Sequence, residues 1–122
     1  MHDLTKVFVE LKAILQPYAD RLDVKKDQEG EFYLDTFFVQ KNKLPLFFAA
    51  VKVQKHYVSY YLMPVYADPE LLEGVSEPLK KRMQGKSCFN FKQIDPLLFQ
   101  ELAELTRVGF ASYQEQGFIA GG

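Results

Sequence analysis

The sequence predicts a two-layer α+β sandwich. We expect an N-terminal helix, a mostly antiparallel sheet of about five strands with a short helical insertion, and a C-terminal helix. Two observations predict this fold. Apolar residues recur at spacings of three and four near both ends of the chain, as on one face of an amphipathic helix. Between them lie short apolar runs bounded by turn residues, as in strands. Two long helices that flank such strands in sequence can cover one sheet face.

The first helix is predicted from an apolar stripe with a stop signal at Pro17, which lacks a backbone donor. Asp3 is a suitable N-cap. The stripe consists of Leu4, Val7, Phe8, Leu11, Ile14, Leu15 and Tyr18.

Strands are predicted in the middle of the chain. Residues 23–36 read as a hairpin with its turn at 28–30, and residues 41–43 form the next turn. The run 44–53 is apolar on both faces, which favours a central position, and 57–63 follows after another turn.

Capping residues and apolar alternation predict the helices and the strand in the second half of the chain. Asp68-Pro69 and Ser76-Glu77-Pro78 each predict a short helix, the second ending at Gly85. Residues 87–91 return as a strand with Cys88 on one face and two phenylalanines on the other. Asp95-Pro96 starts the last helix, up to about residue 116, with a stripe of Leu97, Leu98, Leu102, Leu105, Val108 and either Phe99 or Phe110.

The 122 residues, 48% of them hydrophobic, suffice for one domain, predicted over residues 1–116 with a flexible tail at 117–122. The single cysteine and the polar N-terminus predict a reducing, cytoplasmic setting. No apolar run approaches the ~20 residues of a membrane span.

Charge is uneven although the net charge is −1. Residues 1–40 carry five basic and eight acidic side chains, residues 41–92 nine and four, and residues 93–122 one and four. The near-neutral total argues against a dedicated nucleic-acid protein, and Phe89 and Phe91 alternate as a core face would.

The densest charge is a basic edge of five cations without an acid, which offers a phosphate or carboxylate ligand charge-assisted hydrogen bonds. Lys52 would join it if its side chain leaves the central strand toward that edge. A plain solvated rim is the alternative. The candidate ligand-binding residues are Lys52, Lys80, Lys81, Arg82, Lys86 and Lys92.

No catalytic signature is present. Cys88 has no His and acid arrangement around it, so we expect a buried core residue, and we expect His56 at the surface. His2 has no ligand spacing with it. An enzyme would need a cleft that contains Cys88 or His56. The sequence also indicates an aromatic-rich surface beside the central strand, which would line a pocket or a homodimer contact, at Tyr57, Tyr60, Tyr61 and Tyr66. Ordinary half-buried tyrosines of a sheet are the alternative.

One further pattern consists of the runs Leu44-Pro45-Leu46-Phe47-Phe48-Ala49-Ala50-Val51-Lys52, Tyr60-Tyr61-Leu62, Gly85-Lys86-Ser87 and Phe89-Asn90-Phe91, together with Leu79-Lys80, Leu98 and Leu102. This pattern resembles the YdhG-like domain family of unknown function. The resemblance spans roughly residues 44–113. It implies a frataxin-like order of helix, sheet and helix and, for some relatives, an intracellular iron chaperone. The sequence departs from the family pattern at residues 35–38 and in its thin acidic content on the first helix.

If iron is bound, hard cations take oxygen ligands, and the candidates are the carboxylates of the first hairpin and its approach. A solvated edge with interspersed lysines is the alternative for this region. The candidate ligands are Asp20, Asp23, Asp27, Glu29, Glu31 and Asp35.

The resulting interpretation is a non-enzymatic binding domain, with iron binding and delivery as the role that the resemblance implies. The alternative is an interaction module whose basic strand edge binds an anionic ligand, a protein partner or a second copy of the chain.

Overall fold

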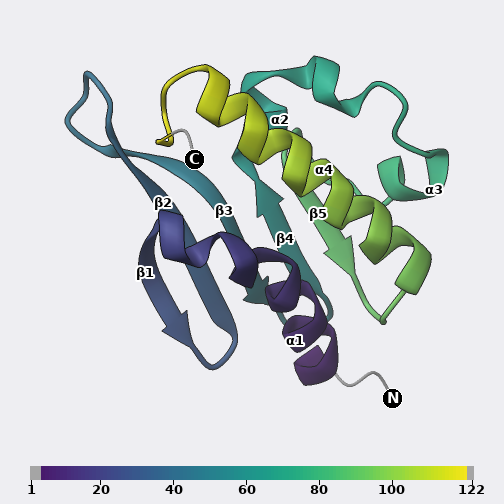
Figure 1. The fold of residues 1–122 in the computed structure, drawn as a ribbon. Helices are drawn as coiled ribbons and strands as arrows, with labels where there is room; N and C mark the ends of the chain where they lie inside the picture. Colours follow the sequence, from purple (N-terminus) through teal and green to yellow (C-terminus); the bar gives the residue numbers. More distant parts are fainter. Residues whose placement is uncertain (1–3, 121–122) are drawn as a thin grey trace.

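A computed structural model describes residues 4–120 and confirms the predicted fold class (Figure 1). Helix α1 (Leu4–Leu15) is followed by a 3-10 turn, η1 (Gln16–Arg21), which contains Pro17. The predicted cap Asp3 and His2 lie outside the described residues. Strands β1 (Asp23–Gln28), β2 (Glu31–Val39), β3 (Pro45–Val53), β4 (Val58–Leu62) and β5 (Cys88–Phe91) form one sheet, and α4 (Pro96–Glu115) ends the fold.

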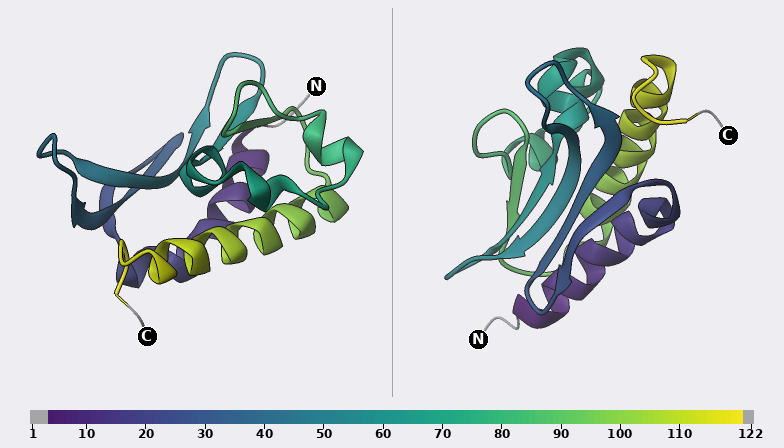
Figure 2. Two further views of the ribbon diagram at one scale, coloured as in Figure 1. Left: turned by 90° about the horizontal axis from the view of Figure 1, so that it is seen from above. Right: turned by 90° about the vertical axis from the view of Figure 1, so that its left-hand side faces the viewer.

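The sheet is an antiparallel meander in the order β1-β2-β3-β4-β5, so β3 is central as its apolar sequence predicts. Figure 2 shows α1 and α4 on the same side of the sheet. Side chains of alternate strand positions point to that side and form the core with the two helices. Phe32, Leu34, Val51, Tyr60 and Phe89 are among these buried residues.

Buried polar groups in the core are paired. The hydroxyls of Tyr60 and Thr106 are 2.6 Å apart, and Thr106 donates to the Leu102 carbonyl at 2.8 Å. Tyr60 is fully buried, so its predicted place on an aromatic surface is wrong. Its ring completes the core, and its hydroxyl reaches a partner there, as a buried tyrosine requires.

Short helices connect β4 to β5. Helix α2 (Met63–Ala67) begins directly after β4, and η2 (Pro69–Leu72) follows with Asp68 accepting from the Glu70 N–H. Ser76 caps α3 (Glu77–Lys80), as the sequence predicts, by accepting from the Leu79 N–H. The prediction that this helix reaches Gly85 is wrong. It ends at Lys80 because the chain then turns to pair with β5, where the Asn90 N–H donates to the Arg82 carbonyl.

Two predictions about the C-terminal part are also wrong. Leu97, in the first turn of α4, is 78% exposed, while Phe99 and Phe110 are both buried. The predicted flexible tail is packed over residues 117–120. Ile119 is 5% exposed, and the Phe118 ring contacts Phe38 and Tyr113, with centroids 4.8 and 5.4 Å apart. Residues 121 and 122 lie outside the described residues.

None of the helices within residues 4–120 is long and apolar enough to cross a membrane.

Candidate functional site

The sheet face opposite α1 and α4 carries a polar row across three strands. In the strand register, Lys52 of β3 lies opposite Ser59 of β4, and Ser59 lies opposite Asn90 of β5. Their neighbours in sequence are core residues, so alternation places these three side chains on the opposite face. The row ends at the β5 edge of the sheet.

A pocket of about 340 Å³ lies at that end of the row. Three of its lining residues are cations, three are neutral polar residues, and none is an acid. Its lining residues are Tyr57, Lys81, Arg82, Met83, Gln84, Asn90 and Lys92.

The three cations of the pocket are exposed and uncompensated. Lys81, Arg82 and Lys92 take part in none of the ion pairs found within residues 4–120. A second hollow of about 250 Å³ adjoins it, sharing Arg82 and Lys92 and adding Asp95. The Asp95 carboxylate already accepts from the Leu98 N–H at the start of α4. The pocket itself is lined by three cations and no acid, and the Asp95 carboxylate lies in the adjoining hollow.

The segment between α3 and β5 is held against the outer edge of β5. The Gln84 N–H donates to the Cys88 carbonyl at 2.9 Å, and the Asn90 N–H donates to the Arg82 carbonyl at 2.8 Å. Gly85, with φ of 82°, makes the turn between these two contacts, a backbone conformation that glycine adopts without strain. These bonds fix the backbone positions from which Arg82 and Gln84 reach the pocket.

A hydrogen-bond network orients the two amide side chains of the pocket. The hydroxyl of Ser59 and the thiol of Cys88 donate to Oδ1 of Asn90 at 2.7 and 3.3 Å. Nδ2 of Asn90 donates to Oε1 of Gln84 at 2.9 Å. Ser59 is 2% exposed, so the network is anchored from inside the sheet.

Because of this network, most of the hydrogen-bonding groups that the pocket leaves free are donors. Both amide oxygens are used as acceptors, while one N–H of Asn90 and both N–H groups of the Gln84 amide make no hydrogen bond within residues 4–120. Lysine and arginine side chains only donate. The groups left for a ligand are therefore almost all donors, and they suit an acceptor with negative charge.

Cys88 is half-buried, so the prediction of a buried core cysteine is wrong. The strand places it on the face opposite the core, beside Asn90. Burial raises the pKa of the Cys88 thiol, although hydrogen bonds with Ser59 and Tyr61 oppose the rise. The group is therefore a neutral thiol at pH 7, which is a poor nucleophile. His56 is exposed in the β3–β4 turn, as predicted.

The remaining predicted cations lie outside the pocket. Lys80 is 3.9 Å from Glu77, and the Lys86 ammonium lies 5.9 Å from the centroid of the Tyr66 ring. Lys52 belongs to the polar row but is two strands away from Asn90, about 10 Å at the usual strand spacing. The structure thus groups three of the six predicted ligand-binding cations.

The six predicted metal-binding carboxylates do not converge. Within residues 4–120, no three side chains of His, Cys, Asp or Glu lie close enough together to hold a metal ion. Asp23 is 2.8 Å from the Lys25 ammonium, Asp27 is 2.7 Å from that of Lys12, and Glu31 is 3.5 Å from that of Lys26. The others are dispersed: Asp20 is exposed in η1, Glu29 is exposed in the β1–β2 turn, and Asp35 is 6% exposed on β2.

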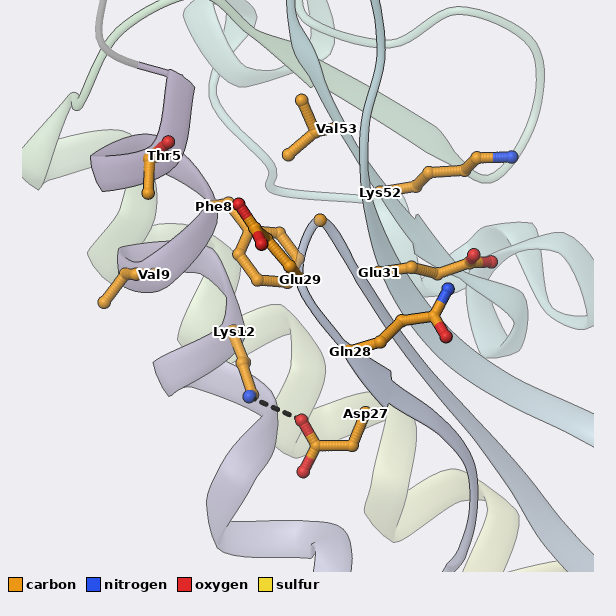
Figure 3. A pocket seen from close by; sticks show the side chains of 11 residues that line it. Thr5, Phe8, Val9, Lys12, Asp27, Gln28, Glu29, Glu31, Lys52 and Val53 are labelled. Carbon is orange, nitrogen blue, oxygen red and sulfur yellow. Dashed lines mark hydrogen bonds and ion pairs between the residues drawn. The ribbon is translucent and has the colours of Figure 1, made fainter.

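Another hollow, of about 860 Å³, lies between α1 and the β1–β2 turn. Figure 3 shows Lys12 of α1 reaching across it to Asp27, and Glu29 lying over Phe8. Lys52 and Glu31 point away from α1 in this view. Lys12 and Asp27 pair with each other, and Lys52 and Glu31 point away, so these four charged groups do not converge on a ligand.

Sequence reasoning missed Ser59, Gln84 and Asn90, whereas Tyr57, which was predicted to line a pocket or a dimer contact, does line this pocket. Strand alternation alone contains the signal for Asn90: it lies between the core residues Phe89 and Phe91 and shares a face with Cys88. Its role as the centre of the amide network needs β4 beside β5, which no local pattern gives.

Comparisons with protein-family models, with curated proteins and with solved structures find no match for this chain. The resemblance to YdhG-like domains therefore stays a prediction.

Proposed function

We propose that this domain binds a small ligand that carries a phosphate or carboxylate group, in the pocket around Asn90. One observation carries the proposal: Lys81, Arg82 and Lys92 line a single pocket without an acid or an ion-pair partner in the described part of the chain. The amide network supports it, because both amide oxygens already accept a hydrogen bond, while three amide N–H groups have no partner in the described part of the chain.

The expected affinity is modest. Each hydrogen bond between a charged group and the ligand contributes about 1.5–3 kcal/mol at best, and exposure to solvent reduces this. Two or three such contacts correspond to a dissociation constant roughly in the micromolar to millimolar range. Binding should weaken as ionic strength rises, because the cations are exposed and screened by salt.

Isothermal titration calorimetry with inorganic phosphate and pyrophosphate at low ionic strength tests the proposal. Arg82→Gln and Lys92→Gln should each weaken binding severalfold or more. Lys86→Gln is the matched control, since it removes the same charge from the same stretch of sequence but outside the pocket. Equal weakening by all three variants would show diffuse attraction to positive charge, and absence of any heat with the wild type would refute the site.

Iron binding and delivery, implied by the resemblance to YdhG-like domains, is the less supported proposal. The order of helix, sheet and helix fits it, but the candidate carboxylates are paired with lysines or dispersed. Anaerobic titration of Fe²⁺, followed by amide NMR broadening with Mg²⁺ as a control, tests it. Broadening that Fe²⁺ causes only at residues 20–35 would support iron binding by this hairpin, and absence of selective broadening would contradict it.

A further inference from the structure

The end of the β2–β3 hairpin, residues 36–45, forms an arm that projects beyond the rest of the sheet (Figures 1 and 2). It concentrates exposed apolar side chains. Phe37, Val39 and Leu44 are 69, 60 and 60% exposed, and Phe38 is 39% exposed. An apolar cluster of this kind on a projecting hairpin is typical of an interaction surface.

The arm also has an open strand edge. Strand β1 pairs with β2 only as far as Asp23 opposite Asp35, whereas β2 continues to Val39. Beyond Asp35, no other strand of residues 4–120 pairs with this edge of β2. An unpaired edge presents backbone donors and acceptors to which a strand from another chain can add.

Charge complementarity identifies the strand that fits. Asp23 and Asp35 lie directly opposite each other, an unfavourable pairing of like charges, and Lys25 forms an ion pair with Asp23. The tip of the arm carries Lys41 and Lys43, which are exposed and form no ion pair within the described residues. When the arm of a second copy lies antiparallel along this edge and is centred on Phe38, Phe37 of one copy lies opposite Val39 of the other. It also brings Lys41 to the two aspartates.

We propose that the arm is a homodimer interface, in which the β2 edges of two copies pair antiparallel about a two-fold axis at Phe38. The contact is isologous: each copy supplies the same apolar pair and the same complementary charges. It lies away from the anion pocket at the β5 edge, on the opposite side of the meander. The proposal is therefore independent of the proposed function.

Sedimentation velocity over a range of concentrations tests this interface with the full chain. The wild type should move from 14.1 kDa toward twice that mass as its concentration rises. Phe37→Lys should weaken dimerisation by at least about thirtyfold, because Phe37 is central to the interface. The two-fold symmetry removes its contact from both copies at once. Leu97→Lys is the matched control, because Leu97 is equally exposed but lies on α4. A wild type that stays monomeric at its highest soluble concentration would overturn the proposal, as would equal dissociation by both variants.

A charge exchange tests the antiparallel geometry. Lys41→Asp alone and Asp23→Lys alone should each weaken the dimer, and the double variant should regain most of the wild-type mass. Dissociation that persists in the double variant, with an unchanged circular dichroism spectrum, would contradict the placement of Lys41 at the aspartates.

Discussion

The β1–β2 hairpin and the segment from Lys80 to Lys92 are two charged regions of the chain, and their charges are compensated to different extents. In the hairpin, acids and lysines alternate in sequence, and three carboxylates are neutralised by lysines within 3.5 Å. In the later segment, only Lys80 forms an ion pair within residues 4–120, while Lys81, Arg82 and Lys92 share a pocket that no acid lines. We therefore expect a binding site where the protein leaves charge uncompensated in a concave place, and not where charged residues are merely dense in the sequence.

The largest expected effect comes from reversing the uncompensated charges. Arg82→Glu combined with Lys92→Glu should abolish phosphate binding, because the pocket then repels an anion. Stability should change by less than about 0.5 kcal/mol, since both side chains are exposed. Calorimetric titration and thermal unfolding measure the two quantities. Retained phosphate binding would mean that the anion binds elsewhere.

A single isosteric change in the amide network should have the next largest effect. Asn90→Asp keeps the acceptors for Ser59 and Cys88 but removes the donor to Gln84 and adds a negative charge. We expect phosphate binding to weaken about tenfold or more, which corresponds to about 1.4 kcal/mol. Asn42→Asp, on the arm, makes the same charge change as a control. If both variants bind phosphate alike, the network does not contribute to the site.

In the hairpin, Asp35 should make stability fall as pH rises. Burial raises the pKa of this carboxyl; Lys25 opposes the rise and Asp23 adds to it. With the folded pKa above the unfolded value of 3.8, the native state binds more protons, so stability declines through the window just above pH 3.8.

Asp35→Asn should therefore stabilise the protein at pH 7 by about 0.2–1 kcal/mol, the usual range for a cross-strand pair. The gain should vanish near pH 3, where the wild-type carboxyl is protonated. Urea unfolding at the two pH values measures it. A stabilisation that is the same at both would show that ionisation of Asp35 is not the cause.

The smallest effect is expected from the paired charges. The Lys12 and Asp27 side chains are 23 and 54% exposed, so their ion pair should contribute about 0.2–1 kcal/mol. A double-mutant cycle with Lys12→Gln and Asp27→Asn measures the coupling, and none of its variants should alter phosphate binding. A change in phosphate affinity in this cycle would contradict the separation of the two regions.

The fold was predictable because its signals are local. Pro17, Asp95-Pro96 and the apolar run of β3 each act within a few residues, and each lies at the element that it predicts. The errors follow from long-range contacts. The end of α3 at Lys80 depends on the pairing of Arg82 with Asn90, and the packing of Phe118 depends on Phe38, eighty residues away in sequence.

The site was predictable only in part, for the same reason. Clustering in sequence pointed to Lys81, Arg82 and Lys92. The same cluster in sequence includes Lys86, but the turn at Gly85 places the Lys86 ammonium near the Tyr66 ring, outside the pocket. Tyr57 lines the pocket from the turn before β4, and Ser59 of β4 donates to Asn90, so only the strand order brings these two residues to the site. The carboxylates of the hairpin were expected to act together, yet strand pairing distributes them among lysines.

The most direct test of the central claim is a phosphate titration of the ¹⁵N-labelled protein at low ionic strength, followed by amide NMR. The account predicts saturable shifts at residues 81–84 and 90–92 and none at residues 23–35. Shifts of similar size at lysines throughout the chain, or shifts centred on the hairpin, would contradict it.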